Sequence, residues 1–132
     1  MMHGEVRLRA DVMETLKELD DGTFFRELIQ LFLDHTPPLI ETLEEAYRRG
    51  DRLASHSAAH KLKGSCANIG AEVLAELASR LEPKQQVQAL PIEDALSIIS
   101  RLRNEFSWVK NALMLEVENQ QARPWNQTPI SY

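Results

Sequence analysis

The sequence predicts an all-α protein, an antiparallel up-down four-helix bundle with an additional short N-terminal helix. Apolar residues recur at helical spacing along most of the chain, and no segment shows the alternating β-branched pattern of a strand. Glycine and proline are scarce, at 5 and 6 of 132 residues, and they are clustered. Because the connections between the helical segments are short, consecutive helices are expected to pack antiparallel.

Turn residues delimit the first two helices. The first is expected over residues 9–19, and the Asp-Asp-Gly sequence at 20–22 ends it. The second is expected to begin with Thr23 as its N-cap, to kink at Pro37-Pro38 and to stop at Gly50. Its apolar stripe is expected to consist of Phe24, Leu28, Leu31, Phe32, Leu39, Leu43 and Tyr47.

Three more helices are expected in the second half of the chain. Asp51 caps a third helix that runs to about residue 69, with Gly70 just past its end. A fourth covers residues 72–82, and a loop bracketed by Pro83 and Pro91 leads to the fifth. Their inward-facing residues are expected to be Val73, Leu74, Leu77 and Leu81, then Ile92, Leu96, Ile99, Leu102, Phe106, Val109 and Leu113. Beyond this stripe the periodicity ends, so the prediction is a domain over residues 1–117 and a flexible tail over 118–132.

Composition and charge restrict the classes of function. A chain of 132 residues suits one domain, and no run approaches the roughly 18 apolar residues of a membrane span. A single cysteine, Cys66, excludes an internal disulfide, and no secretory signal is evident, so we expect a cytoplasmic protein. The net charge of −5 argues against nucleic acid or an anionic membrane as the main partner. The expected partner is another protein.

One histidine of the third helix is expected on the side opposite to the buried stripe. At about 100° per residue, Ala58, Cys66 and Ile69 lie within about 40° of Leu62. His60 lies about 160° away from Leu62, so its imidazole should face outward. Cys66 should be buried and inert.

Small and basic residues surround this histidine on the predicted outer face. A mid-helix glycine costs about 1 kcal/mol relative to alanine, so Gly64 is best explained if another backbone approaches there. A neutral imidazole is nucleophilic near pH 7, and Lys63 could neutralise charge on phosphoryl oxygens. The ordinary alternative is that His60 and Lys63 are solvated surface residues.

The segment 59–82 closely resembles the signature of histidine-containing phosphotransfer (HPt) domains, and the helix order over residues 10–115 is similar to that of the family. The resemblance implies that His60 accepts a phosphoryl group through Nε2, that Lys63 stabilises phosphoryl charge, and that Gly64 gives a receiver domain steric access. The residues that carry it are His60-Lys61-Leu62-Lys63-Gly64-Ser65, Gly70-Ala71 and Leu81-Glu82.

The resemblance also implies the reaction and its partners. A phosphorelay intermediate takes its phosphoryl group from an aspartate of one receiver domain and passes it to another receiver. The Mg²⁺ is expected on the receiver, and no cofactor or metal is expected on this chain. Neither a glycine-rich phosphate loop nor the kinase motifs occur, so no kinase activity is expected. The implied partners are response-regulator receivers and the rest of a hybrid sensor histidine kinase, with this domain a monomer.

One position departs from the family pattern. In several members a glutamine follows the histidine by 22 positions and hydrogen-bonds to Nδ1, whereas Glu82 occupies that position here. A carboxylate would orient the ring and hold a proton on Nδ1, but it would also favour the imidazolium and leave less of the nucleophilic form. A solvated Glu82 is the other interpretation.

An apolar docking patch on the second helix is a further hypothesis. Phe24, Phe25, Leu28 and Leu31 are the candidates, and Phe25 is the best surface candidate, although such stripes are more often core.

Two other functions are compatible with the sequence. The i, i+4 spacing of His56 and His60 could hold a metal or haem, whereas under the phosphotransfer interpretation His56→Ala leaves transfer largely intact. The second alternative is a non-catalytic bundle that binds or sequesters a receiver or another protein.

Overall fold

The structure is a computed structural model that describes residues 7–19, 21–83 and 90–127. Within these residues every regular element is a helix, as the sequence predicts. The helices are α1 (Ala10–Lys17), α2 (Thr23–Arg49), α3 (Arg52–Asn68), α4 (Glu72–Leu81) and α5 (Ile92–Gln127). In this described part, no helix is long and apolar enough to cross a membrane.

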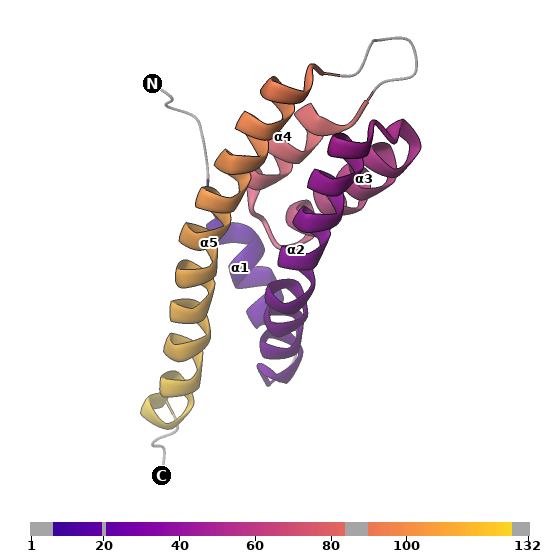
Figure 1. The fold of residues 1–132 in the computed structure, drawn as a ribbon. Coiled ribbons are helices and arrows are strands. Elements are labelled where there is room, and N and C mark those ends of the chain that lie inside the picture. The colour runs from indigo at the N-terminus through magenta and orange to yellow at the C-terminus, as the bar shows by residue number, and fades with distance from the viewer. Residues whose placement is uncertain (1–6, 20, 84–89, 128–132) are drawn as a thin grey trace.

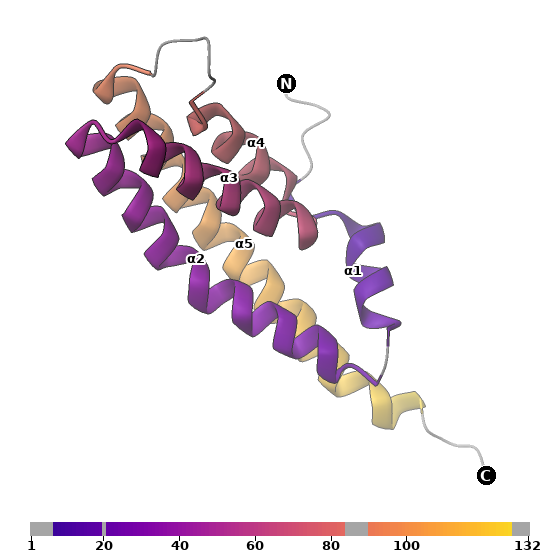
Figure 2. The same ribbon diagram turned by 90° about the vertical axis from the view of Figure 1, so that its right-hand side faces the viewer.

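Helices α2 to α5 form the predicted up-down bundle, in which α2 and α4 each pack between α3 and α5. The two long helices, α2 and α5, lie side by side over most of their length (Figure 1). Helices α3 and α4 cover one half of this pair, and α1 lies beside the other half (Figure 2). The buried apolar residues form one continuous core, so the outer faces of α3 and α4 are left for other contacts.

Glycines end α2 and α3 as predicted. Gly50 and Gly70 have φ values of 69° and 81°, a left-handed conformation that glycine adopts without steric cost. After each glycine the chain bonds back to the last helical turn, through Asp51 N to Ala46 O at 2.9 Å and Ala71 N to Cys66 O at 2.9 Å. The side chain of Asp51 then accepts a hydrogen bond from Ala54 N at 3.0 Å and caps α3, as expected.

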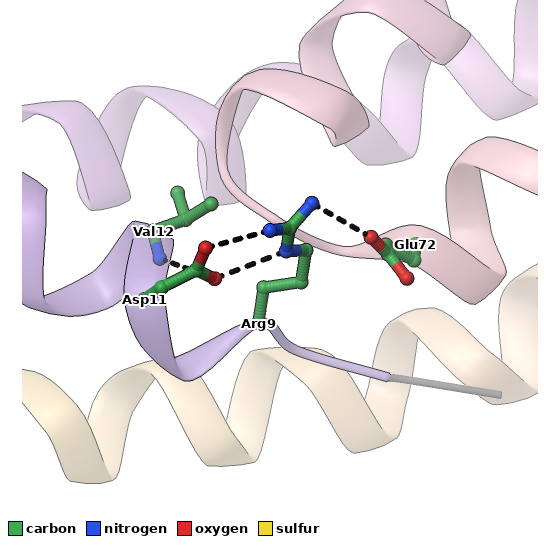
Figure 3. Close-up of polar contacts among 4 residues, drawn as sticks. All are labelled: Arg9, Asp11, Val12 and Glu72. Atoms are coloured by element: carbon green, nitrogen blue, oxygen red, sulfur yellow. Dashed lines mark hydrogen bonds and ion pairs between the residues drawn. The ribbon is translucent and has the colours of Figure 1, made fainter. Parts of the chain in front are cut away.

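Arg9 attaches α1 to the turn between α3 and α4 (Figure 3). Its backbone N–H donates to Gly70 O at 2.8 Å. Its guanidinium bridges Asp11 of α1, at 2.6 Å, and Glu72 in the first turn of α4, at 3.1 Å. Lys17 pairs with Glu116 of α5 at 2.5 Å, so both ends of α1 are tied to the bundle.

Helix α2 differs from the prediction at its start. Gly22 is the N-cap and Thr23 is the first helical residue, whose N–H donates to the carboxylate of Asp21 at 3.0 Å. The helix continues through Pro37 and Pro38, where the sequence predicts a kink. The buried hydroxyl of Thr36 donates to Phe32 O at 2.6 Å in the turn just before them.

The buried stripe at the start of α2 is only partly as predicted: Phe32 is buried as expected, but Phe25 and Ile29 are buried where Phe24 and Leu31 were expected. Phe25 is 0% exposed and lies in the core, so the prediction that it is the best surface candidate is wrong. Phe24 and Leu31, which were expected in the stripe, are 42% and 52% exposed. Residues 24, 28 and 31 and residues 25, 29 and 32 follow the same helical spacing, so the spacing alone does not decide which set is buried in the core.

Helix α5 is longer than the sequence predicts. Its backbone remains helical to Gln127, past the expected domain end at 117. Gln120 is partly buried beside Gly22, so α5 keeps a packing partner beyond the point where its apolar stripe ends. The part of the expected tail over 128–132 lies outside the described residues.

Candidate functional site

His60 projects from the middle of α3 on the side that the helical arithmetic predicts. Its side chain is 65% exposed, whereas Leu62 is fully buried. Ala58, Cys66 and Ile69 also lie in the core, so the predicted buried stripe of α3 is confirmed.

Glu82 reaches His60 because of the way α4 ends. The residue before a proline avoids the helical conformation, and Glu82, followed by Pro83, adopts φ −82° and ψ 112°. The helix therefore stops at Leu81, one residue earlier than predicted. From this position the Glu82 carboxylate is only 8% exposed, and its Oε2 lies 3.0 Å from Nδ1 of His60. The sequence left open whether Glu82 contacts His60 or is solvated. In the structure it is buried and contacts His60.

Lys63 completes a small charge cluster with the same carboxylate. Its Nζ lies 3.1 Å from Oε1 of Glu82. Burial raises the pKa of Glu82, but the hydrogen bonds and positive charges of Lys63 and His60 lower it by more. The net pKa therefore lies below the ordinary value of a glutamate, and Glu82 is ionised near neutral pH.

His56 also contacts Glu82, which the sequence did not predict. Its Nε2 lies 3.6 Å from Oε2 of Glu82, and its Nδ1 lies 3.1 Å from the carbonyl oxygen of Pro83. Its ring is stacked on that of His60, with the centroids 6.0 Å apart and the planes 10° apart. The i, i+4 spacing was the available signal, but the sequence could not place Glu82 beside the pair.

Tyr47 of α2 is a second residue that the sequence reasoning missed as part of this region. Its buried hydroxyl donates to the carbonyl oxygen of Leu81 at 2.5 Å. Sequence periodicity places Tyr47 in the core, and it is there, but periodicity says nothing about the hydroxyl.

The surface beside His60 is open and made of small residues. Among the described residues, no atom lies within 4 Å of the place that a Cβ would occupy on Gly64. Ser57 and Ala67, which lie on the same side of α3, are exposed as well. The absence of a side chain at Gly64 is therefore not required by packing within the described part of this chain.

The metal hypothesis finds no support in the geometry. Within the described ranges, no group of three or more His, Cys, Asp or Glu side chains is arranged to hold a metal ion. Cys66 is fully buried, and burial raises the pKa of its thiol to about 12. The thiol is therefore protonated and unreactive at neutral pH.

The contacts of His60 suit a nucleophile. A carboxylate accepts hydrogen bonds, so the bond to Glu82 places the imidazole proton on Nδ1. In the neutral ring the lone pair then resides on Nε2, which makes no hydrogen bond to any described residue. The site thus presents an oriented imidazole with an available lone pair on an open surface.

Comparisons with known proteins identify a family and a fold for this chain. Residues 27–112 match the family described as the Hpt domain. The sensor protein TorS of Escherichia coli (strain K12) is 30% identical over 76 residues, which are 58% of this chain and 8% of TorS. The crystal structure of histidine-containing phosphotransfer protein B (HptB) from Pseudomonas aeruginosa PAO1 has the same fold. Its TM-score is 0.72 at 24% identity, over 86% of this chain and 96% of that one.

Proposed function

This chain belongs to the Hpt domain family, and from that premise we propose that it is a phosphorelay intermediate in which His60 accepts a phosphoryl group from a receiver aspartate and passes it to another receiver. The observation that carries the proposal is the contact between Nδ1 of His60 and the buried carboxylate of Glu82. This contact orients an otherwise exposed ring toward a partner.

The transfer is a displacement at phosphorus. The lone pair of Nε2 attacks the phosphorus of the aspartyl phosphate in line, an N–P bond forms, and the P–O bond to the aspartate breaks. The electron pair of that bond stays on the aspartate, which leaves as a carboxylate. The imidazole keeps its proton on Nδ1 and becomes positively charged, and the negative charge of Glu82 stabilises that new charge. The reverse displacement delivers the phosphoryl group to the next receiver.

Lys63 and Gly64 have supporting roles in this proposal. Lys63 is half-buried and lies within one helical turn of His60, so its charge can stabilise the phosphoryl oxygens. Gly64 leaves the surface open to a receiver backbone. A groove beside Lys63 is lined by both basic and acidic side chains. Arg9 is paired there with Asp11 and Glu72, whereas Arg80 of α4 and Arg101 of α5 are the basic residues that would favour an acidic receiver pocket. A Mg²⁺ on the receiver would complete the charge compensation.

The expected partners are response-regulator receiver domains. The likeness to a segment of a sensor protein favours a place next to a sensor histidine kinase, and the chain spans only a small part of that relative. We propose that the described chain acts as a monomer, because its site is built from α3 and α4 of one molecule.

The test is transfer of a radioactive phosphoryl label from phosphorylated receivers to the purified chain. Wild type should acquire a base-stable, acid-labile label, His60→Gln should acquire none, and Lys63→Ala should be labelled more slowly. His35→Gln is a matched control, because His35 is an exposed histidine on α2 outside the cluster. If the wild type is folded but no receiver labels it, the phosphorelay function is contradicted. The better proposal is then a non-catalytic bundle that binds or sequesters a receiver or another protein.

A further inference from the structure

Three consecutive residues at the end of α4 are held by side chains from the neighbouring helices. The carbonyl of Leu81 accepts a hydrogen bond from Tyr47 of α2 at 2.5 Å. The carboxylate of Glu82 pairs with His60 and Lys63 of α3. The carbonyl of Pro83 faces Nδ1 of His56 at 3.1 Å. Glu82 thus lies between two residues, Leu81 and Pro83, whose carbonyl groups are held by hydrogen bonds.

We propose that Tyr47 and His56 are positioning residues, which fix the backbone on both sides of Glu82 and thereby hold its carboxylate against Nδ1 of His60. The inference rests on the proposed phosphotransfer function and adds two residues to it. Neither residue touches the phosphoryl group in this proposal.

The backbone at Glu82 needs such anchors because it has left the helix. Its extended conformation follows from Pro83, and its N–H makes a short-range bond to Ser79 O at 3.2 Å. A proline has no N–H, so Pro83 contributes no donor of its own. The carboxylate can reach His60 and Lys63 only if the backbone at Glu82 is held in place, and the contacts to the adjoining carbonyls hold it.

The ring of His56 is held by one hydrogen bond, at Nδ1. A carbonyl oxygen can only accept, so the nitrogen that faces Pro83 must carry a proton. The other nitrogen lies 3.6 Å from Oε2 of Glu82, the oxygen that also binds His60. The two imidazole rings are nearly parallel, with an angle of 10° between their planes.

Tyr47 supplies a donor from the interior of the bundle. Burial raises the pKa of its phenol, with Arg52 opposing, so the hydroxyl remains protonated and can donate. The hydrogen bond joins α2 directly to the last turn of α4. It therefore links the core of the bundle to the residue that orients His60.

The experiment reads the tautomer of His60 directly. Imidazole ¹⁵N chemical shifts, measured at about pH 8 where ordinary histidines are neutral, report the fraction of His60 with its proton on Nδ1. Tyr47→Phe and His56→Leu each remove one anchor. His56→Asn is the conservative variant, because its amide can still donate to the carbonyl of Pro83.

Matched controls separate positioning from general damage. Thr36→Val, like Tyr47→Phe, removes a buried hydroxyl that donates to a carbonyl, but that carbonyl belongs to Phe32 in its own helix. His35→Leu removes an exposed histidine of α2. Circular dichroism and urea unfolding should show that each variant is folded before its tautomer is read.

The positioning role predicts a shift of His60 toward the Nε2–H tautomer in Tyr47→Phe and His56→Leu, with partial rescue in His56→Asn and no change in either control. The rate of phosphoryl transfer from a receiver should fall about tenfold in the same two variants, as when the residues that orient a functional histidine are removed. For His56 this replaces the expectation from the sequence that its removal leaves transfer largely intact, because the structure shows its ring against the carbonyl of Pro83, next to Glu82. An unchanged tautomer in both variants, or an equal loss of rate in Thr36→Val, would overturn it. If no receiver labels the wild type but the tautomer shifts as expected, the proposed function fails and the positioning role stands.

Discussion

The carboxylate of Glu82 is nearly buried and still ionised, because Lys63 and His60 stabilise its negative charge. A buried carboxylate without such partners would take up a proton instead. Compared with an amide at this position, a carboxylate accepts the same hydrogen bond from Nδ1 and adds a negative charge. That charge would favour the positively charged ring that forms in the proposed reaction, in which Nε2 binds phosphorus.

The ionisation of Glu82 predicts a pH dependence of stability. Its pKa in the folded chain is below the ordinary 4.5, so the unfolded state takes up a proton first as the pH falls. The stabilisation is complete above about pH 4.5 and is lost as the pH drops through the folded value. Urea unfolding at a series of pH values should show a steeper loss in this range for wild type than for Glu82→Gln. Parallel curves for the two proteins would contradict the assignment.

Gly64 predicts opposite effects on stability and on activity. An alanine there adds a Cβ that meets no described atom and removes the cost of a mid-helix glycine. Gly64→Ala should therefore raise the free energy of unfolding by about 0.5–1 kcal/mol. The added methyl group should slow transfer from a receiver, because the partner would have to approach closely at this point. Urea unfolding measures the effect on stability, and the rate of phosphoryl transfer from a receiver measures the effect on activity. An unchanged transfer rate would mean that the receiver does not approach closely at Gly64.

The sequence predicts one part of the site better than the other. His60 could be oriented by arithmetic, because its helix has a clear buried stripe and a fixed angle per residue. The contacts of His56 and Tyr47 could not be predicted in this way, because they depend on where the end of α4 lies in space. The predicted fourth helix includes Glu82, although a following proline disfavours the helical conformation there, and only the packing of α4 on α3 shows which way the Glu82 side chain points.

At the scale of elements, α2 shows how a helix pattern can be ambiguous. Its first half has two adjacent apolar stripes, and a helix with a wide apolar face can turn either one inward. In the folded bundle the stripe of Phe25, Ile29 and Phe32 is the one in the core. Helix boundaries, by contrast, were predictable to within one or two residues at the glycines and at Asp51, where local backbone chemistry decides.

Two neighbouring phenylalanines test this register. Phe25→Ala should lower the free energy of unfolding by about 3–5 kcal/mol, because it leaves a cavity in the core. Phe24→Ala should lower it by no more than about 1 kcal/mol, because much of that ring is already exposed. Urea denaturation of the pair measures both values. Equal costs would mean that α2 is rotated relative to the described structure.

At the scale of the whole molecule, the bundle was predicted from helix count and short connections, whereas the position of α1 was not. Helix α1 is short and lies against the turn at Gly70, where Arg9 joins it to the start of α4. Such contacts between distant segments leave no periodic signal in the sequence. The same holds for the continuation of α5 to Gln127, which extends past the apolar stripe.

Two glycines with positive φ test the docking of α1. Gly50→Ala should lower stability by about 1–2 kcal/mol through backbone strain alone, since no described atom lies within 4 Å of its new Cβ. Gly70→Ala carries the same strain, and its Cβ would lie 3.0 Å from Cβ of Val12. It should therefore cost more and should also speed amide hydrogen exchange in α1, which Gly50→Ala should not. Equal effects on α1 would show that this contact does not hold the helix.

Because Cys66 is buried, its thiol is a natural probe of how often the helix bundle opens. The thiol lies on the inner side of the helix that presents His60, and it is the single cysteine of the sequence. A thiol-modifying reagent can therefore label the native protein only when the bundle parts at α3. The labelling rate would report how often that helix separates from its neighbours, before and after phosphorylation or receiver binding, with no engineered label in the molecule.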